Sequence, residues 1–507
     1  MLPLKPFDPS SVEQLINARI GGAVTPSLAS AIAAKTGGNP FFVEEIVKSL
    51  QEQQSLLPTD SGWELTGSHR LGLPDSVKMI VNQRIERLGK PAADLLALAA
   101  VIGRQFTQNL LRALTTANEE IIADALGRCE DAGIILAAPG LASDGYKFSH
   151  DLIQEALYDS IGAAPKRRYH LQIGHVLEST HRRDSDDDSE TLAYHFAAGN
   201  DLAKALTYSL KAGEHAERSY SWARAAAHFE TALALLERQS GDAAAKGRLH
   251  EKLADLASLL GHANLAHSHR ALEIFTALND WPRVCRLQRL IGVAWTSGPA
   301  GKVDLEKALD HFEKAAEIIE PQPDSTEKAL AHGYLAFGLL RAKLDLPRAR
   351  SEAGKALVIA NELNDADVQA RVYTELGVTQ ALIGDLARAE DSAERSWHIS
   401  QNAKDPWLGA RAALYPITFW PWRNDRLWLE RWVRRCFEQR QSFRVTRYDL
   451  ATYSLQALYL ALTGQPEHAW QALNQAEQAL AERGYFTPYW LHFPAAVYGI
   501  LGEDDKA

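Results

Sequence analysis

The sequence predicts an all-α protein in which a small helical domain with one β-hairpin precedes a long solenoid of helical repeats. Three observations predict this fold class. A short motif returns at steps of 40 or 41 residues in the second half of the chain. Apolar residues recur at helical spacing through the first third. One pair of short apolar segments flanks a turn-forming stretch. With 507 residues, the chain has room for about three domains.

Residues 1–72 are expected to form short helices that end in a polar, glycine-containing connector around Thr59–Gly72. Within them, residues 36–47 read TGGNPFFVEEIV. Asn39 can cap a helix, and Pro40 suits the first turn, where a missing N–H costs nothing. The apolar side chains that follow share one helical face: Phe42, Val43, Ile46, Val47 and Leu50.

Residues 73–180 predict a second domain, built mostly from helices. Its apolar periodicity marks four helices: one through Val77, Ile80, Val81, Ile85 and Leu88, then Ala92–Ile102, Leu110–Leu114 and Ile121–Cys129. The segments Gly133–Ala138 and Tyr146–Phe148 flank a turn rich in Pro, Gly, Ser and Asp, which predicts a β-hairpin. A further helix covers Ser149–Ile161. This order predicts a winged-helix-like domain.

Residues 181–190 are expected to be an acidic, solvated linker. They cannot form a calcium loop, because the glycine and the distal glutamate of an EF-hand are missing.

Residues 191–507 carry the repeats. The motif is Asp-x3-Ala-x3-(Ala/Phe)-x2-(Ala/Ser), and its regular copies start at Asp304, Asp345 and Asp385, with degenerate ones at Asp425 and Gln465. An earlier, less regular unit carries Ala225, Phe229 and Ala232. Spacings of four and three place the small residues on one helical face, where a neighbouring helix can approach closely. A period this regular predicts a helical solenoid. The pattern resembles tetratricopeptide repeats more closely than HEAT repeats.

Composition excludes several classes. The net charge of −10 argues against non-specific binding to nucleic acid or anionic membranes. The three cysteines have no metal-type spacing, no signal peptide is apparent, and no apolar run is long enough to span a bilayer. We therefore expect a reduced, cytoplasmic protein that binds neither nucleic acid nor membrane.

The motifs of catalysis are missing from the sequence. The nearest match to a phosphate-binding loop is 298–303, GPAGKV, which lacks the first glycine at the right offset and ends in valine. No apolar strand ends in an aspartate that would serve as Walker B. His262, His267 and His269 do not share a helical face, so no metal site is expected. The sequence thus predicts no enzyme activity on this chain.

The expected recognition helix of the winged-helix-like domain is acidic. Residues 119–131 carry Glu119, Glu120, Asp124, Glu130 and Asp131 against the single Arg128. Such a face repels phosphates, so this domain is interpreted as structural or regulatory.

Six of the twelve tryptophans fall between Trp397 and Trp432, in the least regular repeat. One interpretation is that bulky rings fill a wide gap in a bent repeat. The other is an aromatic patch that binds a partner peptide or small effector. The candidate binding residues in this second interpretation are Trp407, Trp420, Trp422, Trp428 and Trp432.

Segments along the first 235 or so residues also resemble a known family. GGNPFFVEE resembles the Gly-x-Pro segment of the lid subdomain in STAND-class P-loop ATPases, which are large signalling switches. LPDSVKMIVNQRIERL, AAVIGRQF, KFSHDLIQEALY and LAYHFAAGNDLAKAL then follow in the family's order. The chain is similar to STAND ATPases with tetratricopeptide tails. Such proteins are fused to class III adenylate/guanylate cyclase domains, Ser/Thr kinases or LuxR-type regulators.

The resemblance implies that residues 1–72 are a remnant of the lid subdomain. It implies nucleotide-side contacts for Pro40 and for His150, since the family's histidine contacts the β-phosphate. ATP or ADP and Mg²⁺ are implied only for a longer parent protein, because the phosphate-binding half would precede residue 1. We also expect the last helix, near Tyr489–Ile500, to lack its partner helix and to promote self-association.

These observations predict a signalling scaffold whose repeats bind a partner protein or a small effector. One alternative is the regulatory tail of a multidomain adenylate/guanylate cyclase or Ser/Thr kinase. A further alternative is a LuxR-type transcriptional regulator whose DNA-binding domain lies beyond Ala507.

Overall fold

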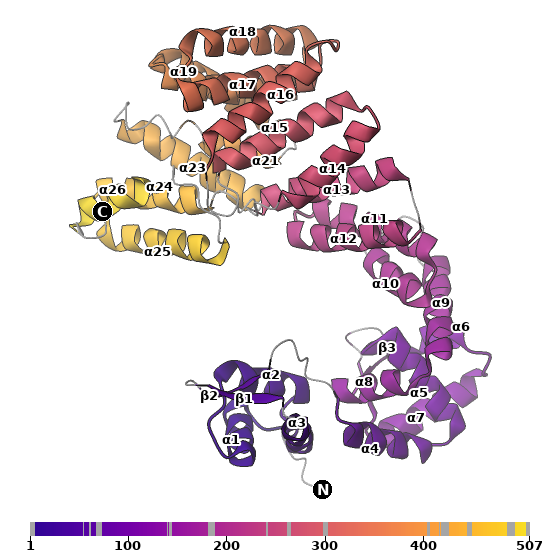
Figure 1. The fold of residues 1–507 in the computed structure, drawn as a ribbon. Coiled ribbons are helices and arrows are strands. Elements are labelled where there is room, and N and C mark those ends of the chain that lie inside the picture. The colour runs from indigo at the N-terminus through magenta and orange to yellow at the C-terminus, as the bar shows by residue number, and fades with distance from the viewer. Residues whose placement is uncertain are drawn as a thin grey trace. The chain divides into compact units, whose positions relative to one another are not determined.

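The computed structural model confirms an all-α chain with two small sheets (Figure 1). It describes residues 6–53, 55–59, 62–66, 73–138, 140, 144–180, 188–239, 242–260, 265–297, 303–402, 406–414, 416, 425–443, 449–483 and 492–502. The chain divides into two compact units, Met1–Tyr208 and Ser209–Ala507. The boundaries expected at residues 72 and 180 both lie inside the first unit, and most of the expected linker 181–190 lies outside the described residues.

The first unit begins with α1 (Pro9–Ile20), α2 (Pro26–Thr36) and α3 (Pro40–Glu52). Each starts on a proline, which has no amide hydrogen to leave unsatisfied. Asn39 caps α3, as predicted, by accepting from the Phe41 amide at 3.1 Å. A hairpin of β1 (Leu56–Thr59) and β2 (Gly62–Leu65) then occupies part of the segment expected to be a polar connector. Four-residue strands with mostly solvated side chains leave little alternation to detect.

The rest of the first unit is helical around a three-stranded sheet. Its elements are α4 (Asp75–Glu86), α5 (Lys90–Ile102), β3 (Gln105–Thr107), α6 (Gln108–Leu114), α7 (Glu119–Asp131), β4 (Ile135–Ala137), β5 (Gly145–Phe148), α8 (Asp151–Ser160), α9 (Ala163–Thr180) and α10 (Ser189–Gly199). The predicted hairpin is confirmed as β4 and β5, with Ile135 opposite Phe148. β3 adds an unpredicted third strand in the order β3-β5-β4.

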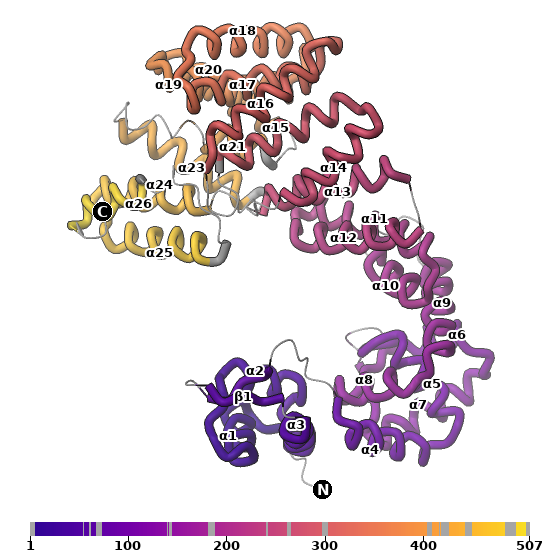
Figure 2. Tube along the Cα trace, in the orientation of Figure 1, coloured from indigo at the N-terminus to yellow at the C-terminus, as the bar shows by residue number. Residues whose placement is uncertain are grey.

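Helices follow one another in antiparallel pairs through the repeats, and Figure 2 traces this succession by colour. They are α11 (Leu202–Arg218), α12 (Trp222–Arg238), α13 (Ala243–Leu259), α14 (Ala266–Ala277), α15 (Trp281–Ser297), α16 (Leu305–Ile319), α17 (Thr326–Lys343), α18 (Leu346–Leu363), α19 (Ala366–Leu382), α20 (Leu386–Ser400), α21 (Pro406–Leu414), α23 (Arg426–Phe443), α24 (Asp449–Leu462), α25 (Pro466–Arg483) and α26 (His492–Leu501).

The repeat motif has a direct structural meaning. Asp304, Asp345 and Asp385 are the N-caps of α16, α18 and α20, and each accepts a hydrogen bond from a backbone amide three residues on. The alanine four residues after each aspartate is at most 1% exposed. The motif therefore marks the second helix of each pair. The first helices also contact one another, α15 with α17, α17 with α19 and α19 with α21, and we call α13, α15, α17, α19 and α21 the inner layer.

Glycines in the first helix of several pairs make room for a phenylalanine ring on the second. A Cβ added to Gly292 of α15 would lie 2.6 Å from Phe312, which is fully buried on α16. The same relation joins Gly213 to Phe229 at 2.6 Å and Gly247 to Phe275 at 2.8 Å. Glycine inside a helix costs about 1 kcal/mol relative to alanine, so close helix approach explains its presence here.

Replacing Gly292 is therefore expected to have the opposite effect from replacing an unobstructed glycine. Gly292→Ala should lower the free energy of unfolding by about 1–3 kcal/mol, because the added methyl group collides with Phe312. The matched control is Gly354→Ala in α18, where no heavy atom lies within 4 Å of the added Cβ. That variant should gain up to about 1 kcal/mol. Urea unfolding of the two variants measures both effects, and equal shifts would contradict the packing account.

The last described helix, α26, packs against α24. Phe493 and Val497 are buried in the main hydrophobic core, whereas Ile500 is 45% exposed. Tyr489 and Trp490, at the start of the expected last helix, lie outside the described residues. Self-association through this helix stays a prediction.

Candidate functional site in the helical repeats

The second unit contains a cavity of about 510 Å³ whose walls come from successive repeats. The five helices of the inner layer all contribute to its lining, together with Glu217 of α11 and Trp222 of α12. This volume falls in the range of small-molecule binding sites. The stacking of first helices therefore builds one shared space from residues that are far apart in the sequence.

Three arginines at the inner end of the cavity occupy the same position in their repeats. Arg371 and Arg411 are 40 residues apart, and Arg289 precedes Arg371 by 82 residues, which is two repeat steps. Leu330 occupies the intervening position. All four line both the cavity and a recess of about 10 Å³ that adjoins it. The period of the solenoid thus aligns them in one row along the inner layer.

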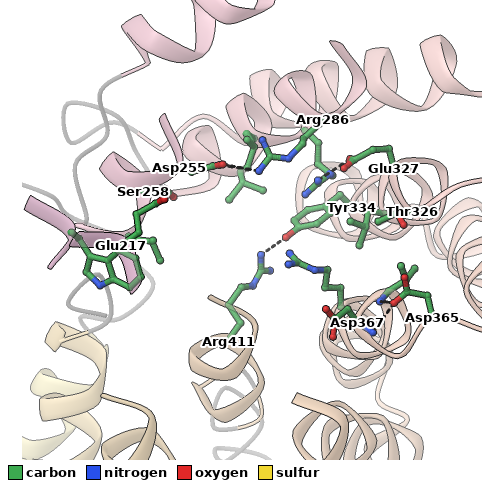
Figure 3. Close-up of a pocket in the computed structure, with 18 residues that line it drawn as sticks. Glu217, Asp255, Ser258, Arg286, Thr326, Glu327, Tyr334, Asp365, Asp367 and Arg411 are labelled. Carbon is green, nitrogen blue, oxygen red and sulfur yellow. Dashed lines mark hydrogen bonds and ion pairs between the residues drawn. The ribbon is translucent and has the colours of Figure 1, made fainter. Parts of the chain in front are cut away.

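Tyr334 of α17 lies at the centre of this arginine group. Arg411 donates hydrogen bonds to the Tyr334 hydroxyl and to Glu375 Oε1, and Figure 3 shows Arg411 directed at Tyr334. The guanidinium carbons of Arg289 and Arg411 lie 5.2 Å and 5.3 Å from the Tyr334 ring centroid. Arg289 also pairs with Glu327 Oε2 at 3.0 Å. The aromatic ring is thus held between charged groups that are themselves paired.

The Arg411–Glu375 pair is almost fully removed from water, with 5% and 3% of the two side chains exposed. Burial raises the pKa of Glu375, because the charged carboxylate loses its hydration, and this outweighs the opposing effect of Arg411. Buried pairs of this kind are costly to form and costly to break. The inner end of the cavity is therefore polar, and its charged groups are held in a buried ion pair.

The outer part of the cavity carries a second ionic network. Arg286 of α15 donates to Glu251 at 2.6 Å and to Asp255 at 2.8 Å, both on α13. Figure 3 shows Arg286 reaching toward Asp255 across the upper wall. Asp365 uses its side chain to cap α19. No histidine or cysteine lines the described part of the cavity. The arrangement is suited to recognition by hydrogen bonds and charge.

The two residues implied as nucleotide contacts come from segments that the fold brings together within the first unit. Pro40 begins α3, and His150 is the N-cap residue of α8. The His150 ring lies edge-on to Phe42 at 5.5 Å, and a Cβ on Gly37 would lie 3.6 Å from its Nδ1. Burial lowers the pKa of His150 and Arg104 adds to this, while the neighbouring Asp151 carboxylate acts in the opposite direction.

The residues around His150 do not fit a nucleotide as its main binding site. Lys35 is paired with Glu155 at 2.6 Å, and Arg104 with Asp151 at 2.6 Å, so both nearby cations already have carboxylate partners. The sequence also supplies no phosphate-wrapping loop. His150 and the two helix N-termini would at most contact the edge of a nucleotide.

Two of the five candidate tryptophans lie in the hydrophobic core, and the side chains of the other three lie outside the part of the chain that the structure describes. Trp428 and Trp432 are 2% and 0% exposed and belong to the main hydrophobic core, so they do not line an open surface. The guanidinium of Arg435 covers the Trp432 ring at 4.3 Å. Trp420 and Trp422 lie outside the described residues, and so does the side chain of Trp407. These two described rings fill space between helices.

Two histidine pairs join consecutive helices, which helical spacing alone did not suggest. His250 Nδ1 of α13 lies 2.8 Å from His267 Nδ1 of α14, and His170 Nδ1 of α9 lies 3.0 Å from His195 Nδ1 of α10. His262 lies outside the described residues. Within the described ranges, no group of three or more metal-ligating side chains converges. The pairs are hydrogen-bonded contacts between neighbouring helices.

The acidic face of α7 leads to a prediction about DNA. Glu119, Glu120, Asp124 and Glu130 are exposed on this helix. A duplex would meet a surface of like charge, so we expect no appreciable affinity for double-stranded DNA at physiological salt. Fluorescence anisotropy with a labelled duplex is the measurement, and binding that weakens steeply with added salt would contradict the prediction.

Comparison with known proteins adds two sequence matches. A family model described as "Domain of unknown function (DUF8739)" matches residues 9–57, which run from α1 into β1. "Uncharacterized protein R02095" of Rhizobium meliloti (strain 1021) is 26% identical over 245 residues. That match covers 47% of this chain and 23% of the relative, so the matched part spans less than a quarter of the relative's length.

Solved structures give a broad likeness in helical arrangement. A Signal Transduction ATPase with Numerous Domains (STAND) protein with a tetratricopeptide repeat sensor, from Pyrococcus horikoshii, has 15% identity and a TM-score of 0.35, covering 94% of this chain and 74% of that chain. A Rap protein complexed with Competence and Sporulation Factor has 14% identity and a TM-score of 0.43, covering 80% and 98%. Scores of this size do not support shared function. Among the described residues, no helix is both long and apolar enough to cross a bilayer.

Proposed function

We propose that this chain is a regulatory binding module whose inner layer of repeat helices takes up an effector. The observation that carries the proposal is the cavity of about 510 Å³, to which all five inner-layer helices contribute lining residues. A ligand held there would contact five repeats at once. Its binding free energy could therefore bias how the repeats stack, which is the physical basis of a sensor.

The chemistry of the cavity favours binding over catalysis. Its charged groups are fixed by pairs such as Arg289–Glu327 and Arg286–Asp255, and its described lining offers no histidine or cysteine. We therefore propose that the chain is not itself an enzyme. The resemblance to STAND ATPases suggests the wider setting, in which such a module would report effector binding to an ATPase, cyclase or kinase partner domain.

Thermal-shift measurements on the purified chain test the proposal, using a panel of amino acids, sugars, nucleosides and organic acids. Leu290→Trp is designed to obstruct the cavity from a partly exposed position on α15. Val358→Trp is the matched control, because Val358 is 55% exposed on α18 and does not line the cavity.

At least one compound should raise the melting temperature of the wild type and of Val358→Trp, but not of Leu290→Trp. The proposal fails if no compound in the panel has an effect, or if the effect survives in Leu290→Trp. The same samples should show no ATP hydrolysis.

A further inference from the structure

Residues that line the adjoining recess carry buried polar atoms of both kinds, donors and an acceptor. Among the described residues, Arg289 Nε, a donor, and Glu375 Oε2, an acceptor, have no hydrogen-bond partner. Both residues line the recess, and they are only 6% and 2% exposed. Each such atom costs about 1–3 kcal/mol if it stays unsatisfied. A polar group that enters the recess can therefore offer hydrogen bonds that the protein itself does not supply.

The recess lies beside the cavity. Arg289, Leu330, Tyr334, Arg371 and Arg411 line both spaces. The recess measures about 10 Å³, which is about the room for one water molecule or one small polar group. The main cavity beside it has apolar walls that include Leu290, Val293 and Leu330. The shape is that of a polar end joined to a wider space that suits an apolar body.

The charges around the recess decide which polar group fits. Arg289 is already paired with Glu327 and Arg411 with Glu375, so two of the guanidinium charges are compensated by the protein. Acidic side chains also line the rest of the cavity, including Asp255, Asp365 and Asp367. A ligand carboxylate would have to approach the Glu375 carboxylate and has no hydrogen to donate to its Oε2. A ligand cation would have to approach the guanidinium groups and could satisfy only the acceptor.

We propose that the recess binds an uncharged group that both accepts and donates a hydrogen bond, a primary amide or a hydroxyl carried on an organic ligand with an apolar body. Its oxygen accepts from Arg289 Nε, and its N–H or O–H donates to Glu375 Oε2. This assignment rests on the proposed function, because it names the ligand class of the same cavity.

A matched series of probes tests the assignment: benzamide, benzyl alcohol and benzoate, which share a ring and differ in one group. Isothermal titration of the full chain at pH 7 should show benzamide and benzyl alcohol binding at least about tenfold more tightly than benzoate, the factor expected for one well-made hydrogen bond. The difference in affinity between benzamide and benzyl alcohol shows whether the recess prefers an amide or a hydroxyl. Leu290→Trp should abolish this binding, and Val358→Trp should leave it intact.

Glu375→Gln offers a second test, because it places a donor where the acceptor was. In this variant the affinity for benzoate should rise relative to the affinity for benzamide, provided that the melting temperature shows a folded protein. The assignment is overturned if benzoate is the tightest ligand of the wild type, which would make the recess an anion site. It is also overturned if none of the three probes binds at roughly 10 mM, a concentration that should reveal a fragment of this size, since the recess would then only hold water. Neither result decides the outcome of the thermal-shift panel, so the proposed function can stand while this assignment fails.

Discussion

Replacing Arg411 by alanine should destabilise the repeats by about 3–5 kcal/mol, the range found when one partner of a buried ion pair is removed. Glu375 would keep its buried position without its main positive partner, and the Tyr334 hydroxyl would lose the hydrogen bond that Arg411 donates. Because repeat proteins open locally, the loss should be greatest near the substitution. Hydrogen exchange of α19, which carries Glu375, is the direct measurement.

Two further variants show whether this loss of stability depends on the burial of the ion pair. Arg431→Ala removes an arginine that is 46% exposed and lies 3.5 Å from Glu390, so its cost should stay within about 1 kcal/mol. Replacing both Arg411 and Glu375 by methionine should cost less than Arg411→Ala alone, because no buried charge is left without a partner. If the double variant loses as much stability as Arg411→Met and Glu375→Met added together, the pair is not energetically coupled.

Acidification should weaken the first unit through its buried histidine pair. His170 and His195 are 0% and 1% exposed, and burial lowers the pKa of each to about 4 from an ordinary value of 6.5. Lys166, whose ammonium lies over the Tyr158 ring at 4.0 Å, lowers the pKa of His170 further. The unfolded chain therefore binds more protons than the folded chain between pH 6.5 and pH 4, so stability falls as the pH drops through that window.

Between pH 7 and pH 5 each histidine should remove about 2 kcal/mol, and the pair about 4 kcal/mol. Urea unfolding at the two pH values gives the loss, and titration of the ring protons by NMR gives the pKa values directly. His398→Ala is the control, because it removes a histidine that is 74% exposed and lies in the second unit. Ring titration near pH 6.5 for both His170 and His195 would contradict the account.

The repeats were predictable because they depend on short-range rules. An aspartate that caps a helix and an alanine four residues later both act within one turn, so the spacing survives in the sequence. The β4–β5 hairpin was predictable for the same reason, because two short apolar segments flank a turn-forming stretch. The β1–β2 hairpin did not, because Leu57 and Pro58 are exposed and show no apolar alternation.

The cavity was not predicted, because its residues are brought together by stacking over more than a hundred residues. Arg289, Arg371 and Arg411 each look like ordinary helix-surface arginines when taken alone. The signal was their common position in the 40- or 41-residue period, which puts them in one row once the first helices stack. The sequence indicated a binding patch at the tryptophans because six of them lie close together, but Trp428 and Trp432 are core residues.

Hydrogen exchange in the presence of an effector shows whether the inner layer is the binding face. The compound to use is the one that gives the largest thermal shift in the panel. We expect slower exchange in α13, α15, α17, α19 and α21, with little change in α16, α18 and α20, whose residues do not line the cavity. Protection confined to those second helices, or to the aromatic segment Arg426–Phe443, would contradict it.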